Sequence, residues 1–82
     1  MVDFVESAFK HGYGEDDFFE ILEGGPVKLR SRRGLEDVSE LSGRNYAGEY
    51  LHAAYRREAE REVVFHIRAM SAREMRRFQR GQ

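Results

Sequence analysis

The sequence predicts an α+β domain with two N-terminal helices, an antiparallel sheet of three or four strands, and a short C-terminal helix. Apolar residues recur at helical spacing before residue 24, and apolar and polar residues alternate between residues 49 and 70. A helix-capping sequence follows that alternation directly. No repeat or linker divides the chain, so we expect residues 1–82 to form a single small α+β domain with helices on one face of the sheet.

The composition limits the class of protein. Hydrophobic residues make up 40% of the chain, including six phenylalanines and four tyrosines, which is enough for a small core without a metal or a disulfide. The absence of cysteine excludes disulfides and thiolate metal sites and fits a cytoplasmic protein. No apolar run is long enough to span a membrane, and the N-terminus does not have the pattern of a secretion signal.

Charge is distributed unevenly along the chain. Residues 1–40 carry five basic and ten acidic side chains, a balance of −5, whereas residues 41–82 carry nine basic and five acidic ones, a balance of +4. One interpretation is an anionic partner for the C-terminal half and a cationic partner for the N-terminal half. The other is two solvated faces of ordinary mixed charge. Twelve of the fourteen basic residues are arginine, whose flat fork of donors suits phosphate.

Three helices are predicted. The first covers residues 4–11 and ends at Gly12, and the second covers residues 15–23, where an acidic first turn suits the helix dipole. A Gly-Gly-Pro sequence at residues 24–26 ends this second helix. Ser71 and Glu74 match a capping box, so a short helix should follow and run to about Gln79. Its buried residues are expected to be Ala72, Met75 and Phe78.

Strands are predicted over residues 27–32, 38–44, 49–56 and 63–70. A turn beginning at Arg33 and Gly34 follows the first strand, a hairpin turn at residues 45–48 follows the second, and a charged loop at residues 57–62 follows the third.

Period-2 alternation sorts the side chains of the last two strands onto two faces. The set expected to pack on the helices is Leu51, Ala53, Tyr55, Val63, Phe65, Ile67 and Ala69. The opposite face then holds Tyr50, His52, Ala54, Arg56, Val64, His66, Arg68 and Met70, with Arg73, Arg76 and Arg77 just beyond the end of the strand.

The histidines and arginines on that opposite face suit one kind of chemistry. Cleavage of RNA by attack of its own 2′-hydroxyl needs a base, an acid for the leaving oxygen, and cations around the phosphate, and it needs no metal. Tyr50 could stack on a splayed base. The plainer interpretation is a solvent-facing sheet surface that is simply polar. Glu49 or Glu74 could also act as the base, although Glu74 has a competing role in the helix cap.

Other chemistries lack their motifs. The three histidines include no pair at helical i, i+4 spacing, so we expect no metal site. Residues 24–26 are not followed by Lys-Ser/Thr and their proline cannot donate a backbone hydrogen bond, so they do not form a phosphate loop. No Ser/His/Asp grouping stands out, and no cofactor is expected.

Two segments carry a family resemblance. Residues 10–17 read KHGYGEDD and run into an apolar helix, and residues 66–78 read HIRAMSAREMRRF, with a Gly-Arg-Asn sequence at residues 43–45 between them. In this order and spacing the chain resembles the BrnT-like toxins of bacterial type II toxin–antitoxin pairs over roughly residues 8–78. That family carries Lys-His-Gly near the start of a helix and a basic strand-to-helix junction near its end.

The resemblance implies a RelE-like fold and a ribonuclease that arrests translation. It also implies a cognate antitoxin with a ribbon-helix-helix DNA-binding domain. Lys10, His11, Arg68 and Arg73 match positions of the family pattern, and Arg44 matches its central basic residue.

With His66 added from strand alternation, the predicted catalytic residues are Lys10, His11, His66, Arg68 and Arg73. The predicted RNA-binding residues are Arg44, Tyr50, His52, Arg56, Arg76 and Arg77. The alternative function is a non-catalytic module that binds nucleic acid or protein with the same basic face.

Overall fold

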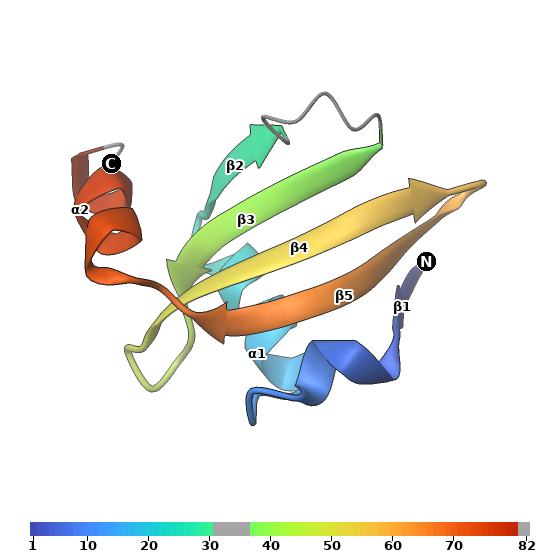
Figure 1. The fold of residues 1–82 in the computed structure, drawn as a ribbon, viewed down its shortest axis with the longest axis horizontal. Coiled ribbons are helices and arrows are strands. Elements are labelled where there is room, and N and C mark those ends of the chain that lie inside the picture. The colour runs from blue at the N-terminus through green and yellow to red at the C-terminus, as the bar shows by residue number, and fades with distance from the viewer. Residues whose placement is uncertain (31–36, 81–82) are drawn as a thin grey trace.

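The chain forms an α+β fold in the computed structural model, which describes residues 1–30 and 37–80 (Figure 1). Within these residues five strands make one mixed sheet in the order β1-β5-β4-β3-β2. No helix in the described part of the chain is long and apolar enough to cross a membrane. The elements are β1 (Val2–Phe4), the 3-10 helix η1 (Glu6–Phe9), α1 (Glu15–Glu23), β2 (Val27–Arg30), β3 (Val38–Arg44), β4 (Tyr50–Glu58), β5 (Arg61–Ala69) and α2 (Ala72–Arg80).

Several predicted elements are confirmed. The α+β class, the helix over residues 15–23, the strand over residues 38–44 and the helix after Ser71 correspond to the fold and to α1, β3 and α2. The strand predicted over residues 27–32 is present as β2 up to Arg30. Its last two residues, and the turn predicted at Arg33 and Gly34, lie outside the described residues.

The N-terminus differs from the prediction. Instead of a helix over residues 4–11, the chain begins with β1, which pairs in parallel with β5, and continues into the short helix η1. The Val5 N–H donates to the Val64 carbonyl at 3.0 Å and the Ser7 hydroxyl donates to the Phe65 carbonyl at 3.2 Å. The free edge of β5 therefore captures this segment, and the sheet is mixed and five-stranded rather than antiparallel with three or four strands.

The charged loop predicted over residues 57–62 is instead a continuation of the β4–β5 hairpin. Arg57 pairs with Glu62 across the ladder and Glu58 pairs with Arg61. Their charged groups lie 3.6 and 3.7 Å apart, so opposite charges face each other on the two strands. Only Ala59 and Glu60 remain in the turn.

A β-bulge changes which residues of β5 face the helices. Ala54 pairs with His66, but the next residue of β4, Tyr55, pairs with Val64, so Phe65 has no partner in the ladder. Val64 is fully buried in the core, whereas the prediction placed it on the outer face. Val63 pairs with Arg56, and Phe65 lies under the Arg56 guanidinium at 5.7 Å. The predicted inner set is therefore wrong for these residues, because simple alternation fails beyond the bulge.

The core forms where α1 lies across one face of the sheet. Phe18 and Ile21 of α1 are fully buried, and burying each side chain contributes roughly 1.5–3 kcal/mol. The strands contribute Leu41, Leu51, Ala53, Tyr55, Val64 and Ile67 to the same cluster.

The turn between β3 and β4 is anchored to α1. Asn45, which is 7% exposed, donates from Nδ2 to Asp17 Oδ1 and to Glu49 Oε1, each at 3.0 Å. The Tyr46 N–H donates to Glu20 Oε1 at 2.8 Å. Gly48 has a φ of 85°, which confirms its predicted place in the hairpin turn. These bonds fix the position of α1 along the sheet.

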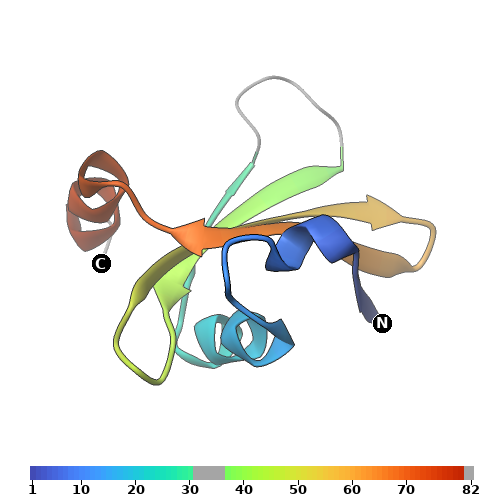
Figure 2. The same cartoon turned by 60° about the horizontal axis from the view of Figure 1, so that its bottom comes forward.

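The C-terminal helix does not share the face of α1. Phe78 of α2 packs edge-on against Tyr50, with ring centroids 5.9 Å apart, and Tyr50 alternates with the core residue Leu51. Figure 2 shows α1 beneath the sheet and α2 beyond its end. Phe78 is buried as predicted, but Met75 is half-buried and Ala72 is exposed. The expectation that helices cover only one face is therefore wrong.

The close contact between α1 and β3 generates the first testable prediction. A Cβ at Gly43 would lie 2.8 Å from Ile21 Cγ2, so Gly43→Ala forces the helix or the strand to shift. We predict that it lowers the free energy of unfolding by about 1–3 kcal/mol in urea titrations. Gly24→Ala is the matched control, because its Cβ would meet no atom closer than 3.5 Å and its φ is −81°. Equal losses in the two variants would contradict the prediction.

Candidate functional site

The candidate site lies on the face of the sheet opposite α1, which we call the second face. Cross-strand register places Ser42, His52 and Arg68 in one row and Glu40, Ala54 and His66 in the next. Tyr50 and Arg56 lie on the same face at either end of this part of β4. The predicted grouping of Tyr50, His52, Arg56, His66 and Arg68 therefore agrees with the register.

Three histidines form a row across this site. The rings of His11 and His66 meet edge to face with centroids 5.5 Å apart, and those of His66 and His52 are 6.1 Å apart. His11 comes from the loop after η1, which packs along the edge of β5. The fold thus brings the N-terminal Lys10-His11 pair to the histidine of the last strand.

His52 is the buried end of the row. Its residue exposure is 7%, its Nδ1 is buried without a hydrogen-bond partner among the described residues, and its Nε2 lies 3.6 Å from Glu40 Oε1. Burial, followed by the positive charge of Arg68, lowers the pKa of His52. The ring is therefore held in its neutral form, and its burial argues against the direct RNA contact predicted for it.

His66 is the half-buried centre of the row. Burial is the largest cause that lowers the pKa of its imidazole, and Arg68, His52, His11 and Lys10 lower it further. Because the folded environment disfavours the charged ring, His66 is neutral near neutral pH. A neutral imidazole at this position can accept a proton.

Arg68 is clamped by Glu74 from the first turn of α2. Arg68 Nη1 and Nη2 donate to the two carboxylate oxygens of Glu74 at 2.6 and 2.7 Å. Nη1 also donates to the Ala69 carbonyl at 3.0 Å. Arginine has five N–H donors, and these bonds use three of them, so two remain for a ligand.

Glu74 therefore has a structural role and is a poor base. The Ser71 N–H donates to Glu74 Oε1 at 2.9 Å and the Glu74 N–H donates to Ser71 Oγ at 3.2 Å, which confirms the predicted capping box. The hydrogen bond from Arg68 is the largest cause that lowers the pKa of Glu74 to about 2. Glu49, the other carboxylate considered as a base, accepts hydrogen bonds from Tyr13 and Asn45 in the β3–β4 turn.

The remaining aromatic and basic residues of the second face already have partners. The Arg44 guanidinium lies 5.1 Å from the Tyr50 ring centroid, and Phe78 packs against the same ring. Arg56 is paired with Glu58. A base could stack on Tyr50 only by displacing one of its neighbours, so the structure does not favour the stacking role predicted for it.

Uncompensated positive charge lies at the two sides of this face. Lys10 and His11 are exposed at the β5 edge, and Arg73, Arg76 and Arg77 are exposed on α2. Among the described residues, none of these five has a carboxylate within ion-pair distance. The basic surface that was predicted on the strands therefore lies beside them, at the β5 edge and on α2.

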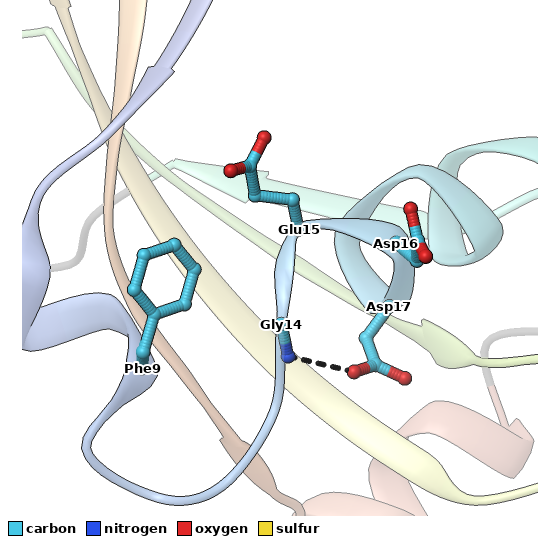
Figure 3. A pocket seen from close by; sticks show the side chains of 5 residues that line it. All are labelled: Phe9, Gly14, Glu15, Asp16 and Asp17. Atoms are coloured by element: carbon cyan, nitrogen blue, oxygen red, sulfur yellow. Dashed lines mark hydrogen bonds between the residues drawn. The ribbon is translucent and has the colours of Figure 1, made fainter.

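The negative charge of the N-terminal half gathers at α1. A shallow hollow at the start of this helix is lined by Phe9, Gly14, Glu15, Asp16 and Asp17 (Figure 3). The Gly14 N–H donates to Asp17 Oδ2 at 2.8 Å across it. Three carboxylates make this hollow unsuitable for an anionic ligand. In the described part of the chain, no three His, Asp or Glu side chains are grouped so that they could hold a metal ion.

Sequence reasoning missed one residue of the site and one contact. Glu40, which lies beside His52, belongs to a strand whose alternation is poor. Glu74 was assigned to the helix cap, but its bidentate contact with Arg68 has no local signal because the two residues lie on different elements. Their opposite charges are the one sequence feature that could have suggested the pair.

The clamp predicts a pH-dependent contribution to stability. The pKa of Glu74 falls to about 2 from an ordinary value near 4.5, so its stabilising effect is full above pH 4.5 and is lost as pH falls from 4.5 to 2. We predict that Glu74→Gln lowers the free energy of unfolding at pH 7 by about 1–3 kcal/mol and removes this pH dependence. Glu60→Gln, in the exposed β4–β5 turn, is the control. Equal urea midpoints for the two variants at pH 7 would contradict the role of the clamp.

The surroundings of His66 predict its titration. We expect the His66 ring signals in NMR spectra to titrate with a midpoint below the ordinary value of 6.5. Lys10→Gln should move the midpoint upward, because it removes a nearby positive charge. Lys28→Gln, on the distant strand β2, should leave it unchanged. A midpoint at or above 6.5 in the unsubstituted protein would overturn this description of the site.

Comparisons with known proteins do not indicate a function for this site. No protein-family model matches this chain, and no curated protein or solved structure matches it either. The histidine row, the Arg68–Glu74 clamp and the free cations beside them are therefore the observations from which a function can be argued.

Proposed function

We propose that this protein is a metal-independent endoribonuclease whose reaction centre is the His11–His66 pair. The observation that carries the proposal is the 5.5 Å separation of these two rings, beside Lys10 and Arg68. A pair of imidazoles flanked by cations can supply a base, an acid and charge stabilisation to one phosphodiester. Each of these groups comes from the chain itself.

The proposed reaction divides the proton transfers between the two rings. Neutral His66 takes the proton from a ribose 2′-hydroxyl, and the 2′-oxygen forms a bond to the adjacent phosphorus. The bond from phosphorus to the 5′-oxygen breaks, and His11 gives that oxygen a proton. The products are a 2′,3′-cyclic phosphate and a 5′-hydroxyl, so no water or metal enters this step.

The cations have separate tasks in this scheme. Arg68 offers its two unused N–H donors to the phosphoryl oxygens, where negative charge increases in the transition state. The Glu74 clamp restricts the guanidinium to one orientation, so less side-chain freedom is lost when the phosphate binds. Lys10 adds positive charge on the exposed side of His11. Arg73 lies in the first turn of α2, one residue before Glu74, and can contact the flanking phosphate.

The biological setting that we propose is a type II toxin–antitoxin pair. The chain would be a divergent BrnT-like toxin with a RelE-like fold that cleaves cytoplasmic RNA and inhibits translation. A cognate antitoxin with a ribbon-helix-helix DNA-binding domain would hold it inactive. In support, the two segments that carry the family resemblance, residues 10–17 and 66–78, meet at the His11–His66 contact.

A non-catalytic binding module is the second candidate. It is favoured by the carboxylate partners of Arg56 and Arg68, which reduce the positive charge that could stabilise a transition state on the sheet and leave binding to the exposed basic residues beside it. Such a module would bind nucleic acid or an acidic protein with an affinity that falls steeply with salt, and it would not turn over.

The proposed reaction predicts cleavage of single-stranded RNA by the purified protein in the presence of EDTA, with 2′,3′-cyclic phosphate ends. His66→Gln and His11→Gln should each lower the rate by about 10²–10⁴-fold, because each removes one proton transfer. Arg57→Gln, at the far end of the hairpin, is the control for a changed charge. RNA that binds but stays intact would favour the non-catalytic module.

In cells, induced expression without the antitoxin should arrest growth and degrade RNA, and co-expression should relieve both effects. Arg68→Ala and Arg73→Ala should each relieve the arrest while the protein stays folded, as judged by circular dichroism. If both variants remain fully toxic, the assignment of these residues is wrong. Normal growth and intact RNA in the toxin-only strain would contradict the toxin proposal itself.

A further inference from the structure

The four arginines of α2 form one stripe along the helix. They follow each other at i, i+3, i+4 and i+7, which places them on one face of an α-helix. The stripe consists of Arg73, Arg76, Arg77 and Arg80, and all four are exposed. The opposite face contains Glu74 and Phe78, which hold α2 to the sheet through Arg68 and Tyr50. The stripe therefore faces away from the body of the protein.

This arrangement opposes the stability of the helix. Like charges at i, i+3 and i, i+4 spacing destabilise a helix, and the stripe contains four such pairs. Arg73 also lies in the first turn, where the helix dipole disfavours a cation. Among the described residues, no carboxylate pairs with any of the four. Helix stability therefore does not explain the stripe, and an external anion would relieve its repulsion.

Four arginines of the β4–β5 hairpin are compensated. Arg56, Arg57, Arg61 and Arg68 each have a carboxylate partner. The stripe is thus a local concentration of free guanidinium groups rather than a sample of a generally basic surface. It also starts one residue before Glu74, next to the clamp at the proposed reaction centre.

We propose that the α2 stripe binds the backbone of single-stranded RNA flanking the cleaved bond and contacts two or three consecutive phosphates. From Arg73 to Arg80 the helix rises by roughly 10 Å at 1.5 Å per residue. Phosphates of one strand lie about 3.4 Å apart along a duplex axis and further apart in an extended strand, so this length matches a few phosphates. The inference rests on the proposed function, because it takes RNA to be the substrate at the His11–His66 pair.

The chemistry of the stripe favours nucleic acid over an acidic protein segment. Protein interfaces have an apolar or aromatic centre surrounded by a polar rim. The large apolar residues of α2, Met75 and Phe78, are on the side that holds the helix to the sheet, so the charged groups of the stripe are all guanidinium groups. Binding to a phosphate backbone is largely electrostatic and needs no apolar anchor.

The test measures binding separately from cleavage. Fluorescence anisotropy would follow a labelled 2′-O-methyl RNA dodecamer, which cannot be cleaved by its own 2′-hydroxyl, between 50 and 200 mM salt. Arg76→Gln/Arg77→Gln should reduce the slope of log affinity against log salt by about 1.4, since each lost phosphate contact removes about 0.7. Over this range the unsubstituted protein should then lose roughly sevenfold more affinity than the variant.

Arg57→Gln/Arg61→Gln is the matched control, because it removes the same charge from the opposite end of the hairpin and should leave the slope unchanged. Arg80→Gln removes one guanidinium group, at the last residue of the helix, and should reduce the salt slope by about half as much. Circular dichroism confirms that each variant is folded.

The outcomes separate this inference from the nuclease proposal. If Arg76→Gln/Arg77→Gln cleaves unmodified RNA and its salt slope is unchanged, the proposed RNA binding by the stripe is wrong and the nuclease proposal is unaffected. A reduced slope without any cleavage would support the stripe and contradict the nuclease. An equal decrease of the salt slope in the variant and in its matched control would also contradict RNA binding by the stripe. Binding of a polyglutamate peptide of equal charge as tightly as RNA would also overturn it, in favour of a protein partner.

Discussion

The ion pair between Arg68 and Glu74 holds the C-terminal helix to the sheet, and both the candidate site and the arginine stripe depend on it. Its two hydrogen bonds are 2.6 and 2.7 Å long, and the same carboxylate caps the helix through Ser71. The Glu74 side chain therefore caps the start of α2 and orients Arg68. Because it joins α2 to β5, it also fixes the position of the arginine stripe relative to the histidines. Hydrogen bonds to charged groups contribute about 1.5–3 kcal/mol each, which is a large part of the stability of a small domain.

Most positive charge at the centre of the second face is paired with carboxylates, and the unpaired charge lies around it. On the second face, Arg56 and Arg68 are paired with carboxylates, and burial keeps His52 in its neutral form. The free cations lie to either side, at Lys10 and along α2, while the carboxylates of α1 lie on the opposite face. A polyanion would be attracted to the sides of the site, and Lys10, together with Arg68, helps to keep His66 in the neutral form that a base requires.

Most of the regular structure could be predicted from local patterns. Alternation located β2, β4 and β5, helical spacing located α1, and the capping box located the start of α2. The failures have particular causes. A three-residue strand such as β1 is too short to show periodicity and forms only because the edge of β5 is free. The bulge at Phe65 reverses the faces of Val63 and Val64, which a strict period of two does not anticipate.

By itself, the sequence determined which residue types were available and, on the α2 side of the bulge at Phe65, which of them share a strand face, because those properties depend on composition and on a local period. Only the tertiary structure decided that His11 meets His66, that His52 is buried and that Glu74 clamps Arg68. Each of these contacts joins different elements of the fold, and their distances depend on how the edge of β5 captures the N-terminus and how α2 packs beyond the end of the sheet. Side-chain proximity across elements is therefore a property of packing and not of local pattern.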